Sequence, residues 1–399
     1  MDRRHFLKTT AAAAAWTALS TGFSAREAFA TVCTPLRTTT FPYLEVSGTP
    51  EEIGIQIGRR FGGNIRKGIE RRAAWFTELK EYALGTGKRH YDAMLRAAQT
   101  HTPGPLMELQ GWAKGSEIPF EHLFILNCKS EFDTFMKKEL GCDGCSTVVL
   151  KDDKRLIVMH NEDGHKAYED LMFVLRVKPK DGTEFIALTY PSVIEGNAPG
   201  INEHGVLVTT NYISSVTVKE GVPRYFLDRM MLEAKTVDEA LKLATHPERG
   251  YAYHHILASI KEGRAISVEA TPDETAVKEI EGLYWHTNHL ILPSTKDHPQ
   301  FQEYTSSSSV PRYQSLSRIL GPLKDPAKVT EEQMLDALSD HVGAPYGLCR
   351  HPAGDVHGST LATAVFSTER PDRDKTPGQH LMHLYRSNPC RRIAEDHWV

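Results

Sequence analysis

The sequence contains few cysteines, little net charge and no long apolar run outside its N-terminal stretch. Six cysteines in 399 residues are too sparse for a disulfide-rich scaffold. Basic and acidic residues nearly balance, 47 against 51, and no long run of basic residues occurs, so a nucleic-acid-binding protein is not expected. The composition, 40% hydrophobic and 25% charged, excludes a disordered, collagen-like or coiled-coil chain and is typical of a globular protein with a large core.

The N-terminal stretch has the features of an export signal. The motif RRHFLK at residues 3–8 is a twin-arginine pattern. A mildly apolar, alanine-rich stretch follows, and an A-x-A cleavage site ends at Ala30, which would leave Thr31 as the first mature residue. The alternative is a short N-terminal transmembrane anchor. We predict a twin-arginine signal peptide over residues 1–30, periplasmic localisation in a bacterium, and no membrane span after processing.

This export route has a consequence for the cysteines. The twin-arginine export machinery, a predicted partner, carries proteins that have already folded in the reducing cytoplasm. Disulfides are therefore not expected to be needed for folding. Cys349 and Cys390 can still pair later in the periplasm, but sequence alone does not determine their pairing.

The chain from about residue 49 to 141 is predicted to be mostly helical. A capping box opens the first helix, because Thr49 is followed by Pro50 and by Glu52. A buried stripe follows at steps of four residues: Ile53, Ile57, Phe61, Ile65 and Ile69. Three glycines lie beside it: Gly54, Gly58 and Gly62. Since each interior glycine costs a helix roughly 1 kcal/mol, three of them indicate close approach of another element. Further helices are predicted near residues 91–100 and from about 119 to 138.

After Gly141 the pattern changes to short β-rich runs. Glycine, proline, aspartate and asparagine separate these runs, as in an antiparallel sheet. Helical patterns are inserted near residues 224–245, 311–320 and 330–341. The order of these elements, helices first and then many strands with inserted helices, predicts an α+β layered fold. The change of pattern places an internal boundary near Cys142.

A glycine–cysteine junction lies at that boundary, in the motif DGCST at residues 143–147. If the peptide between Gly144 and Cys145 were cut, Cys145 would gain a free α-amine with a reference pKa of about 7.7–8.0. Such an amine can take the thiol proton near neutral pH. Attack of the same thiol on the Gly144 carbonyl would give a thioester that water opens. The alternative is a simple turn followed by a buried strand cysteine.

Polar residues at the ends of later predicted strands are candidate partners of Cys145. Asp163 ends the second strand of a predicted hairpin, where it could hold the new ammonium or orient the thiolate. Asn211 and Asn288 lie at or near strand ends, and such amides can donate to a developing oxyanion. The alternative is that both asparagines are ordinary turn residues.

These motifs resemble the isopenicillin N acyltransferase-like (acyl-coenzyme A:6-aminopenicillanic acid acyltransferase-like) family of N-terminal nucleophile hydrolases, and more distantly the choloylglycine hydrolases. The matching stretches are DGCST at 143–147, HNEDGH at 160–165, PGINEHGVLVTTN at 199–211, HTNHL at 286–290 and, in style, SSSSVPRYQSL at 306–316. The resemblance implies a four-layer αββα sandwich, linear amides as substrates and self-cleavage before Cys145. The implied parts are a helical pro-segment over 31–144 and a β-rich subunit over 145–399, which stay associated.

The same resemblance implies roles for single residues. Cys145 is the implied nucleophile, Asp163 the acidic site residue, and Asn211 and Asn288 the amides of the oxyanion hole. His160 stands where choloylglycine hydrolases carry an arginine, so the role of that arginine does not transfer. Arg312 is a looser match to a site arginine of the family.

Metal and redox chemistry are the competing interpretations of the histidines and cysteines. His286 and His289 would point to opposite faces of a strand, and no HExxH motif is present. We therefore predict no metal and no cofactor. The C-x-x-C spacing of Cys142 and Cys145 suggests a redox protein, but the βαβ pattern of a thioredoxin-like domain is missing.

The relatives include both acyltransferases and hydrolases, and the predicted location favours one of these two activities. An acyl-coenzyme A donor is a cytosolic metabolite, whereas water is available in the periplasm. We therefore expect a cysteine amidohydrolase that cleaves a small linear amide through a Cys145 thioester, with acyl transfer as a lesser activity. The non-enzymatic alternative is a periplasmic ligand-binding protein on the same fold, which would lack self-cleavage.

Overall fold

A computed structural model describes residues 40–138, 144–369, 379–387 and 389–399 of the chain. The predicted signal peptide, its cleavage site at Ala30 and Thr31, and Cys142 lie outside these ranges. Within the described ranges, no helix combines the length and apolar character that crossing a membrane requires. Residues 40–399 form one compact unit, so the chain on either side of Cys145 shares a single body.

The first of two sheets has eight strands. In spatial order they are β1 (Tyr43–Gly48), β4 (Phe173–Pro179), β5 (Phe185–Thr189), β6 (Gly200–Asn202), β7 (Val206–Tyr212), β8 (Tyr253–Ser259), β9 (Arg264–Ala270) and β10 (Thr275–Glu279). Neighbouring strands are antiparallel except at the edge, where β1 runs parallel to β4. The strand β1, which precedes the first predicted helix, was not foreseen from the sequence. It means that the segment before Cys145 contributes to this sheet.

The second sheet has six strands, all antiparallel to their neighbours. In spatial order they are β11 (Gly282–His286), β2 (Gly144–Lys151), β3 (Leu156–His165), β12 (Gly358–Ser367), β13 (Leu381–Arg386) and β14 (Ala394–Trp398). The strand β2, which begins at the glycine–cysteine junction, is the second strand of this sheet and is paired on both sides. The pairing with β11 covers only Thr147 to Lys151, so Cys145 at the start of β2 is paired with β3 alone.

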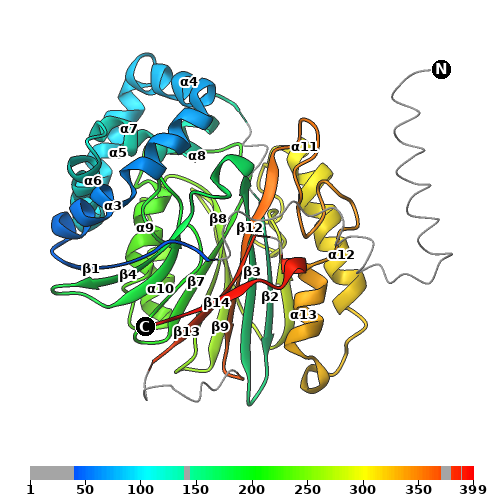
Figure 1. Cartoon of the computed structure of the whole chain (residues 1–399). Helices are drawn as coiled ribbons and strands as arrows, with labels where there is room; N and C mark the ends of the chain where they lie inside the picture. The colour runs from blue at the N-terminus through cyan, green and yellow to red at the C-terminus, as the bar shows by residue number, and fades with distance from the viewer. Residues whose placement is uncertain (1–39, 139–143, 370–378, 388) are drawn as a thin grey trace, which may run out of the picture. The chain divides into compact units, whose positions relative to one another are not determined.

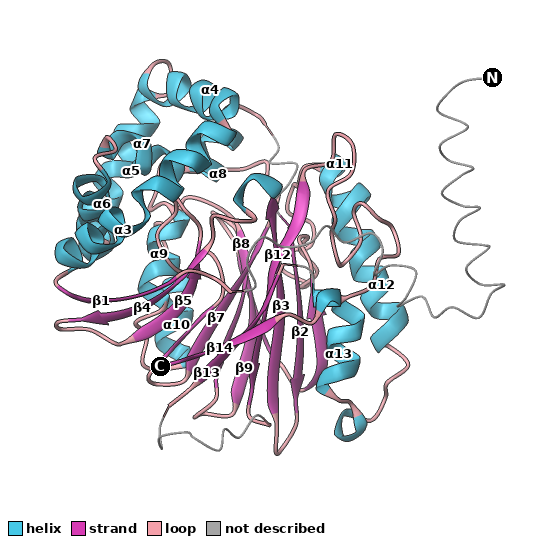
Figure 2. Cartoon of the chain, viewed as in Figure 1, coloured by secondary structure: helices cyan, strands magenta, loops and turns pink. Residues whose placement is uncertain are grey.

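Helices cover the outer face of each sheet, as Figures 1 and 2 show. Helices α9 (Arg224–Met231) and α10 (Val237–Ala244) lie beside the eight-stranded sheet. Helices α12 (Val310–Leu320) and α13 (Glu331–Leu338) cover the six-stranded sheet, where Leu316 and Leu335 pack against Val148 and Ile157. Alternate residues of β2 and β3 instead join the core between the sheets. The predicted α+β, four-layer αββα architecture is confirmed.

The segment before Cys145 is mostly helical, as predicted. Its helices are α3 (Pro50–Arg71), α4 (Ala73–Leu84), α5 (Lys88–His101), α6 (Pro103–Ser116), α7 (Phe120–Leu126) and α8 (Lys129–Phe135). The predicted capping box is present at the start of α3, between Thr49 and Glu52. The single helix predicted over 119–138 is instead two helices, because the chain leaves helical geometry at Asn127 and Cys128.

The glycines of α3 allow direct backbone contact with α6. A methyl group added to Gly54 would lie 2.0 Å from the carbonyl oxygen of Glu108, and one added to Gly58 would lie 2.4 Å from that of Trp112. The contact is reciprocal, since a methyl group on Gly111 would lie 2.3 Å from the carbonyl oxygen of Glu51. The predicted close approach of another element is therefore confirmed, and the two helices cannot separate their backbones without losing this packing.

Candidate active site

The β2–β3 pairing sets which side chains meet at the glycine–cysteine junction. Gly144 pairs with Asp163, and Cys145 pairs with Glu162. Paired residues of antiparallel strands share a face of the sheet. Cys145 and Glu162 therefore face the other sheet, on the same side as Val149, which lies in the core between the sheets. The predicted hairpin brings Asp163 next to the junction as expected, but the direct neighbour of Cys145 is Glu162, which the sequence analysis did not single out.

The backbone of Cys145 is held on both sides of its Cα atom. Its N–H donates to Oδ1 of Asn288 at 2.9 Å, and its carbonyl oxygen accepts from Nη1 of Arg312 at 2.8 Å. Arg312 also donates through Nη2 to Oδ1 of Asn288 at 2.6 Å. Arg312 and Asn288 are both fully buried. The structure thus brings together Cys145 and two of the residues predicted from the sequence, including the loosely matched Arg312.

The orientation of the Asn288 amide follows from its partners. A backbone N–H and a guanidinium can only donate, so the Asn288 oxygen must face them. Its Nδ2 donates to the carbonyl oxygen of Tyr212 at 2.8 Å. The sequence analysis expected Asn288 to donate to an oxyanion. In this chain one N–H of its Nδ2 donates to Tyr212, and its oxygen anchors the Cys145 nitrogen.

Asn211 occupies the facing position in the other sheet, at the end of β7. Its Oδ1 accepts from Oγ1 of Thr147 at 2.9 Å and lies 3.2 Å from Nδ1 of His254. Burial lowers the pKa of His254 well below its usual value, so this imidazole is neutral. The Nδ2 of Asn211 is buried and has no hydrogen-bond partner among the described residues. Because buried donors are nearly always paired, this amide is the better candidate for a group that receives the substrate.

The thiol of Cys145 is held in its neutral form. Burial raises the pKa of this thiol well above its usual value, and the carboxylates of Glu162 and Asp163 raise it further. A hydrogen bond from the Asp163 backbone and the charge of Arg312 act in the opposite direction. The reactive thiolate is therefore not preformed, and a base must remove the proton when the thiol reacts.

His160 joins Glu162 beside this thiol. The Cys145 sulfur, a ring nitrogen of His160 and a carboxylate oxygen of Glu162 lie within 4.8 Å of one another. The Nδ1 atom of His160 lies 2.8 Å from Oγ1 of Thr147, and its Nε2 atom lies 3.3 Å from Oε2 of Glu162. Both ring nitrogens are engaged, so His160 links β2 to β3 next to the nucleophile.

Asp163 is buried on the opposite face of β3. Its Oδ1 accepts from Oγ1 of Thr360 at 2.6 Å, and its Oδ2 lies 3.2 Å from Nε of Arg350. Burial raises the pKa of Asp163 to about 6, while the charges of Arg350 and Arg312 limit the increase. A carboxyl group with this pKa can exchange its proton near neutral pH. Arg350 was missed by the sequence analysis because it lies in a loop with no family motif.

Gly144 is a glycine because two side chains occupy the space of its missing Cβ. An added methyl group would lie 2.7 Å from Nη2 of Arg350 and 2.8 Å from the hydroxyl oxygen of Tyr304. The residue before Cys145 is therefore held against a guanidinium and a phenol. These donors lie beside the peptide bond that the sequence predicts to be cut.

A pocket opens beside Cys145. Its cavity volume is only about 20 Å³, which is room for little more than one water molecule. Its lining residues are Lys129, Cys145, Glu162, Asp163, Tyr190, Asn197, Thr210, Tyr212 and Arg224. The hydroxyl of Tyr190 donates to Oε1 of Glu162 at 2.7 Å. The pocket thus joins the nucleophile to buried carboxylates, cations and aromatic rings.

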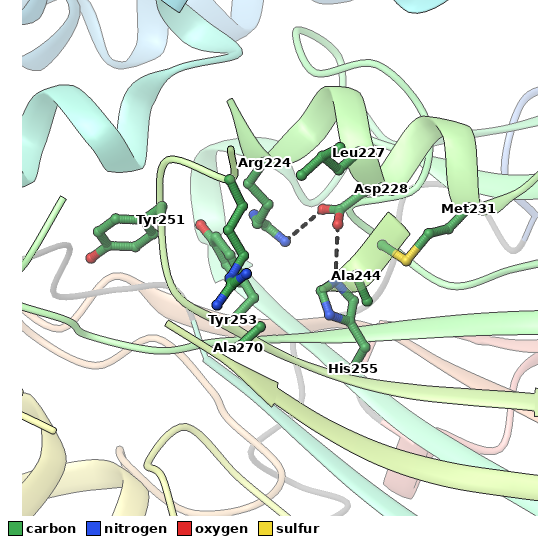
Figure 3. A pocket seen from close by; sticks show the side chains of 10 residues that line it. Arg224, Leu227, Asp228, Met231, Ala244, Tyr251, Tyr253, His255 and Ala270 are labelled. Atoms are coloured by element: carbon green, nitrogen blue, oxygen red, sulfur yellow. Dashed lines mark hydrogen bonds and ion pairs between the residues drawn. The ribbon is translucent and has the colours of Figure 1, made fainter. Parts of the chain in front are cut away.

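Arg224 also lines a second pocket, which Figure 3 shows from close by. There Arg224 donates to Asp228 at 2.8 Å, and His255 lies 2.9 Å from the other carboxylate oxygen of Asp228. The guanidinium carbon of Arg224 lies 3.1 Å from the ring centroid of Tyr253. These contacts fix Arg224 at the wall of the Cys145 pocket.

Among the described residues, two side-chain clusters have ligand atoms close enough to share a metal ion. One is the set of Cys145, His160 and Glu162. The imidazole of His160 already contacts Thr147 and Glu162 through its two ring nitrogens, so this set is a hydrogen-bonded network. The other is the set of His341, Cys349, His351 and Cys390, which lies apart from the nucleophile.

Comparisons with known proteins identify the family of the chain. The sequence model of the acyl-coenzyme A:6-aminopenicillanic acid acyl-transferase family matches residues 149–376. The chain belongs to this family. As a member it is an enzyme of the N-terminal nucleophile hydrolase class that acts on amide C–N bonds. The resemblance seen in the sequence motifs is confirmed.

Two individual proteins illustrate the range of similarity. The chain is 24% identical to the beta-alanyl-dopamine/carcinine hydrolase of Drosophila melanogaster over 376 residues, which are 87% of this chain and 93% of the fly protein. It is also similar to the crystal structure of a mutant conjugated bile acid hydrolase from Clostridium perfringens. That match has 11% identity and a TM-score of 0.40, and it covers 63% of this chain and 96% of the bacterial one.

Proposed function

We propose that the protein is a periplasmic, self-processing cysteine amidohydrolase that cleaves a small linear amide through a thioester on Cys145. The observation that carries the proposal is the pair of contacts on the Cys145 backbone. Asn288 holds the nitrogen that would become the α-amine, and Arg312 holds the adjacent carbonyl. An anchored α-nitrogen in the same residue as the thiol is what a nucleophile with a built-in base requires.

Self-processing would begin at the Gly144 carbonyl. The Cys145 thiol adds to that carbon, its proton passes to a nearby base, and the C–N bond to Cys145 breaks. The leaving nitrogen takes a proton and becomes the α-amine. Water then hydrolyses the thioester, which frees the thiol and leaves a carboxylate on Gly144. Asp163 pairs with Gly144 across the strands and has a pKa of about 6, so it is suited to carry the proton.

Amide hydrolysis would repeat this chemistry on a substrate. The α-amine accepts the thiol proton, the thiolate adds to the amide carbon, and the protonated amine of the substrate leaves. Water adds to the thioester and releases the acid. The Nδ2 of Asn211, which has no hydrogen-bond partner among the described residues, is the proposed donor to the oxyanion in both steps.

Hydrolysis is proposed over transfer because of the predicted location. The proposed twin-arginine signal would carry the enzyme away from cytosolic acyl-coenzyme A, and water is the acceptor that remains. The substrates named for the fly relative, β-alanyl-dopamine and carcinine, define the first compounds to test, together with simple N-acyl amines. Carboxylates and aromatic rings line the space beside Cys145, so amides with a polar end and an aromatic end belong in the same panel.

Intact mass spectrometry of the purified protein, followed by amine release from this panel, tests the proposal. We expect two associated fragments, one ending at Gly144 and one beginning at Cys145. Cys145→Ala should remain uncut and inactive, whereas Cys128→Ala, which removes another buried thiol, should be cut and active. A single uncut chain that still releases amine would contradict the self-processing proposal. A cut chain with no amidase activity on any amide would instead favour the ligand-binding alternative.

A further inference from the structure

Two histidines and two cysteines converge from loops and a short helix around the six-stranded sheet, and none of them lines the Cys145 pocket. His341 follows α13, Cys349 and His351 lie in the loop before β12, and Cys390 lies in the short helix η4 (Pro389–Arg391) between β13 and β14. One ligand atom from each of the four side chains lies within 4.8 Å of the others. Cys349 is fully buried and the other three are partly buried.

The distances match four ligands around one ion. Tetrahedral zinc, with Zn–S near 2.3 Å and Zn–N near 2.0–2.1 Å, separates two sulfurs by about 3.8 Å, a sulfur and a nitrogen by about 3.6 Å, and two nitrogens by about 3.3 Å. The two Sγ atoms lie 3.7 Å apart. Nε2 of His351 lies 3.7 Å from Sγ of Cys349, 4.0 Å from Sγ of Cys390 and 2.9 Å from Nε2 of His341. Each of these four distances is within about 0.5 Å of the tetrahedral value, and a ring nitrogen of His341 lies within 4.8 Å of both sulfurs.

A disulfide would account for only half of this cluster. The sequence leaves a Cys349–Cys390 disulfide open, and in the structure the two Sγ atoms lie 3.7 Å apart, which is longer than a disulfide bond. A disulfide, however, gives no reason for two imidazoles to converge on the same two sulfurs. Two thiolates and two imidazoles form a Cys₂His₂ donor set, which is typical of structural zinc.

We propose that His341, Cys349, His351 and Cys390 bind one structural Zn²⁺ ion. All four coordination positions are filled by protein side chains, so no position is open for a substrate or a reactive water. The ligands come from three separate segments of the chain. The site therefore fastens the loop before β12 and the C-terminal η4 to the end of α13. The proposal is independent of the proposed amidase activity.

The site has a direct connection to the catalytic region. Arg350 lies between the ligands Cys349 and His351 in the sequence. Its Nε contacts the carboxylate of Asp163, and its Nη2 donates to Oγ of Ser308 at 2.5 Å. Binding of the ion to Cys349 and His351 would fix the backbone on both sides of Arg350. Zinc would thus position the guanidinium that faces Asp163 and Gly144.

Metal analysis of the full-length purified protein tests the proposal. We expect about one zinc ion per chain by inductively coupled plasma mass spectrometry, in line with one Cys₂His₂ site. After removal of zinc under reducing conditions, Co²⁺ should give the thiolate charge-transfer band and the intense d–d bands of a tetrahedral site. Cys390→Ser and His341→Asn should each lower the metal content at least tenfold. The matched controls Cys128→Ser and His357→Asn should keep it.

Three outcomes would overturn the proposal. One is wild-type protein that binds neither Zn²⁺ nor Co²⁺ after reduction. Another is a peptide map in which Cys349 and Cys390 are joined and two hydrogens are missing from the mass. The third is zinc that survives in the ligand variants but is lost in Cys145→Ala, which would place the ion at the nucleophile. If a ligand variant fails to fold, protection of the Cys349 and Cys390 thiols from alkylation by added Zn²⁺ in the wild-type protein gives the same answer.

Discussion

The side-chain oxygen of Asn288 accepts the backbone N–H of Cys145 at 2.9 Å and shares that oxygen with Arg312. The nitrogen that self-cleavage would release is therefore fixed before any bond is broken. After the cut, the same oxygen would accept a hydrogen bond from the amine in either of its protonation states. A base that is anchored in this way needs no rearrangement before it serves the thiol.

Asn288→Ala is expected to change the pH dependence of the enzyme. An acceptor hydrogen bond favours the protonated amine, so its loss should lower the pKa of the α-amine and move the acid limb of kcat/KM to lower pH. The pH profile is to be measured on the fully processed fraction, with Asn64→Ala as a control because that side chain contacts a distant carbonyl, that of Leu171. An unmoved acid limb would show that Asn288 does not hold the catalytic amine.

Asn211→Ala should affect turnover more than substrate binding. Its Nδ2, which has no partner in the described part of the chain, is the proposed oxyanion donor, and loss of one such donor typically costs about 10²–10³ in kcat. KM should change little, since the interaction forms mainly in the transition state. The measurement is kcat per processed active site. Turnover close to that of the wild type would exclude Asn211 from the oxyanion hole.

Gly144→Ala should slow or prevent self-cleavage. The added methyl group would lie 2.7 Å from Arg350 and 2.8 Å from Tyr304, so the scissile peptide would shift or these donors would move away. The matched control is Gly63→Ala in helix α3, where nothing lies within 4 Å and the change should stabilise the helix by roughly 0.5–1 kcal/mol. Time-resolved intact mass of newly made protein follows the cut. Equal cleavage rates for the two variants would contradict this steric argument.

Asp163 should make the uncut protein less stable as pH rises through the acid range. Its folded pKa of about 6 lies above the unfolded value of 3.8, so the folded chain binds the proton more tightly. The resulting stabilisation is complete below about pH 4 and is lost by about pH 6, a change of roughly 3 kcal/mol. Urea unfolding of Cys145→Ala and of Cys145→Ala/Asp163→Asn between these pH values isolates the effect. Parallel stability profiles for the two proteins would contradict it.

Changing Arg3 and Arg4 to lysine should keep the protein in the cytoplasm of the producing bacterium. The substitution preserves the charge but removes the paired guanidinium groups of the predicted export motif. Lys8→Arg is the matched control, and cell fractionation with immunoblotting is the measurement. Normal periplasmic recovery of the double variant would contradict the assigned route.

The sequence predicted those features of the fold and of the site that depend on local patterns. The capping box at Thr49, the close helix contact at Gly54 and the approach of Asp163 to the Gly144 junction each follow from spacing within one segment or one hairpin. Glu162 was within reach of the same reasoning. In an antiparallel hairpin that pairs Gly144 with Asp163, the next residue, Cys145, must pair with Glu162.

Other site residues depend on contacts between distant segments, which spacing cannot encode. Arg350 and Tyr304 reach Gly144 from loops and helices far along the chain, and no local motif marks either residue. The zinc ligands proposed here come from three segments, so their spacing resembles no compact metal motif. The role of Asn288 required the direction of its amide, which only the positions of Tyr212 and Cys145 determine.

The parallel pairing of β1 with β4 has a consequence for the lifetime of the enzyme. Main-chain bonds such as Val174 N–H to Pro42 and Lys180 N–H to Gly48, both at 2.8 Å, join the segment before the proposed cut to the segment after it. Once cut, these segments would be separate molecules that share one sheet. Unfolding would then be a first-order event, whereas refolding would require two chains to collide and would slow on dilution. A processed enzyme that lost its fold in a dilute compartment would regain it only rarely, so its working life would be set by its unfolding rate.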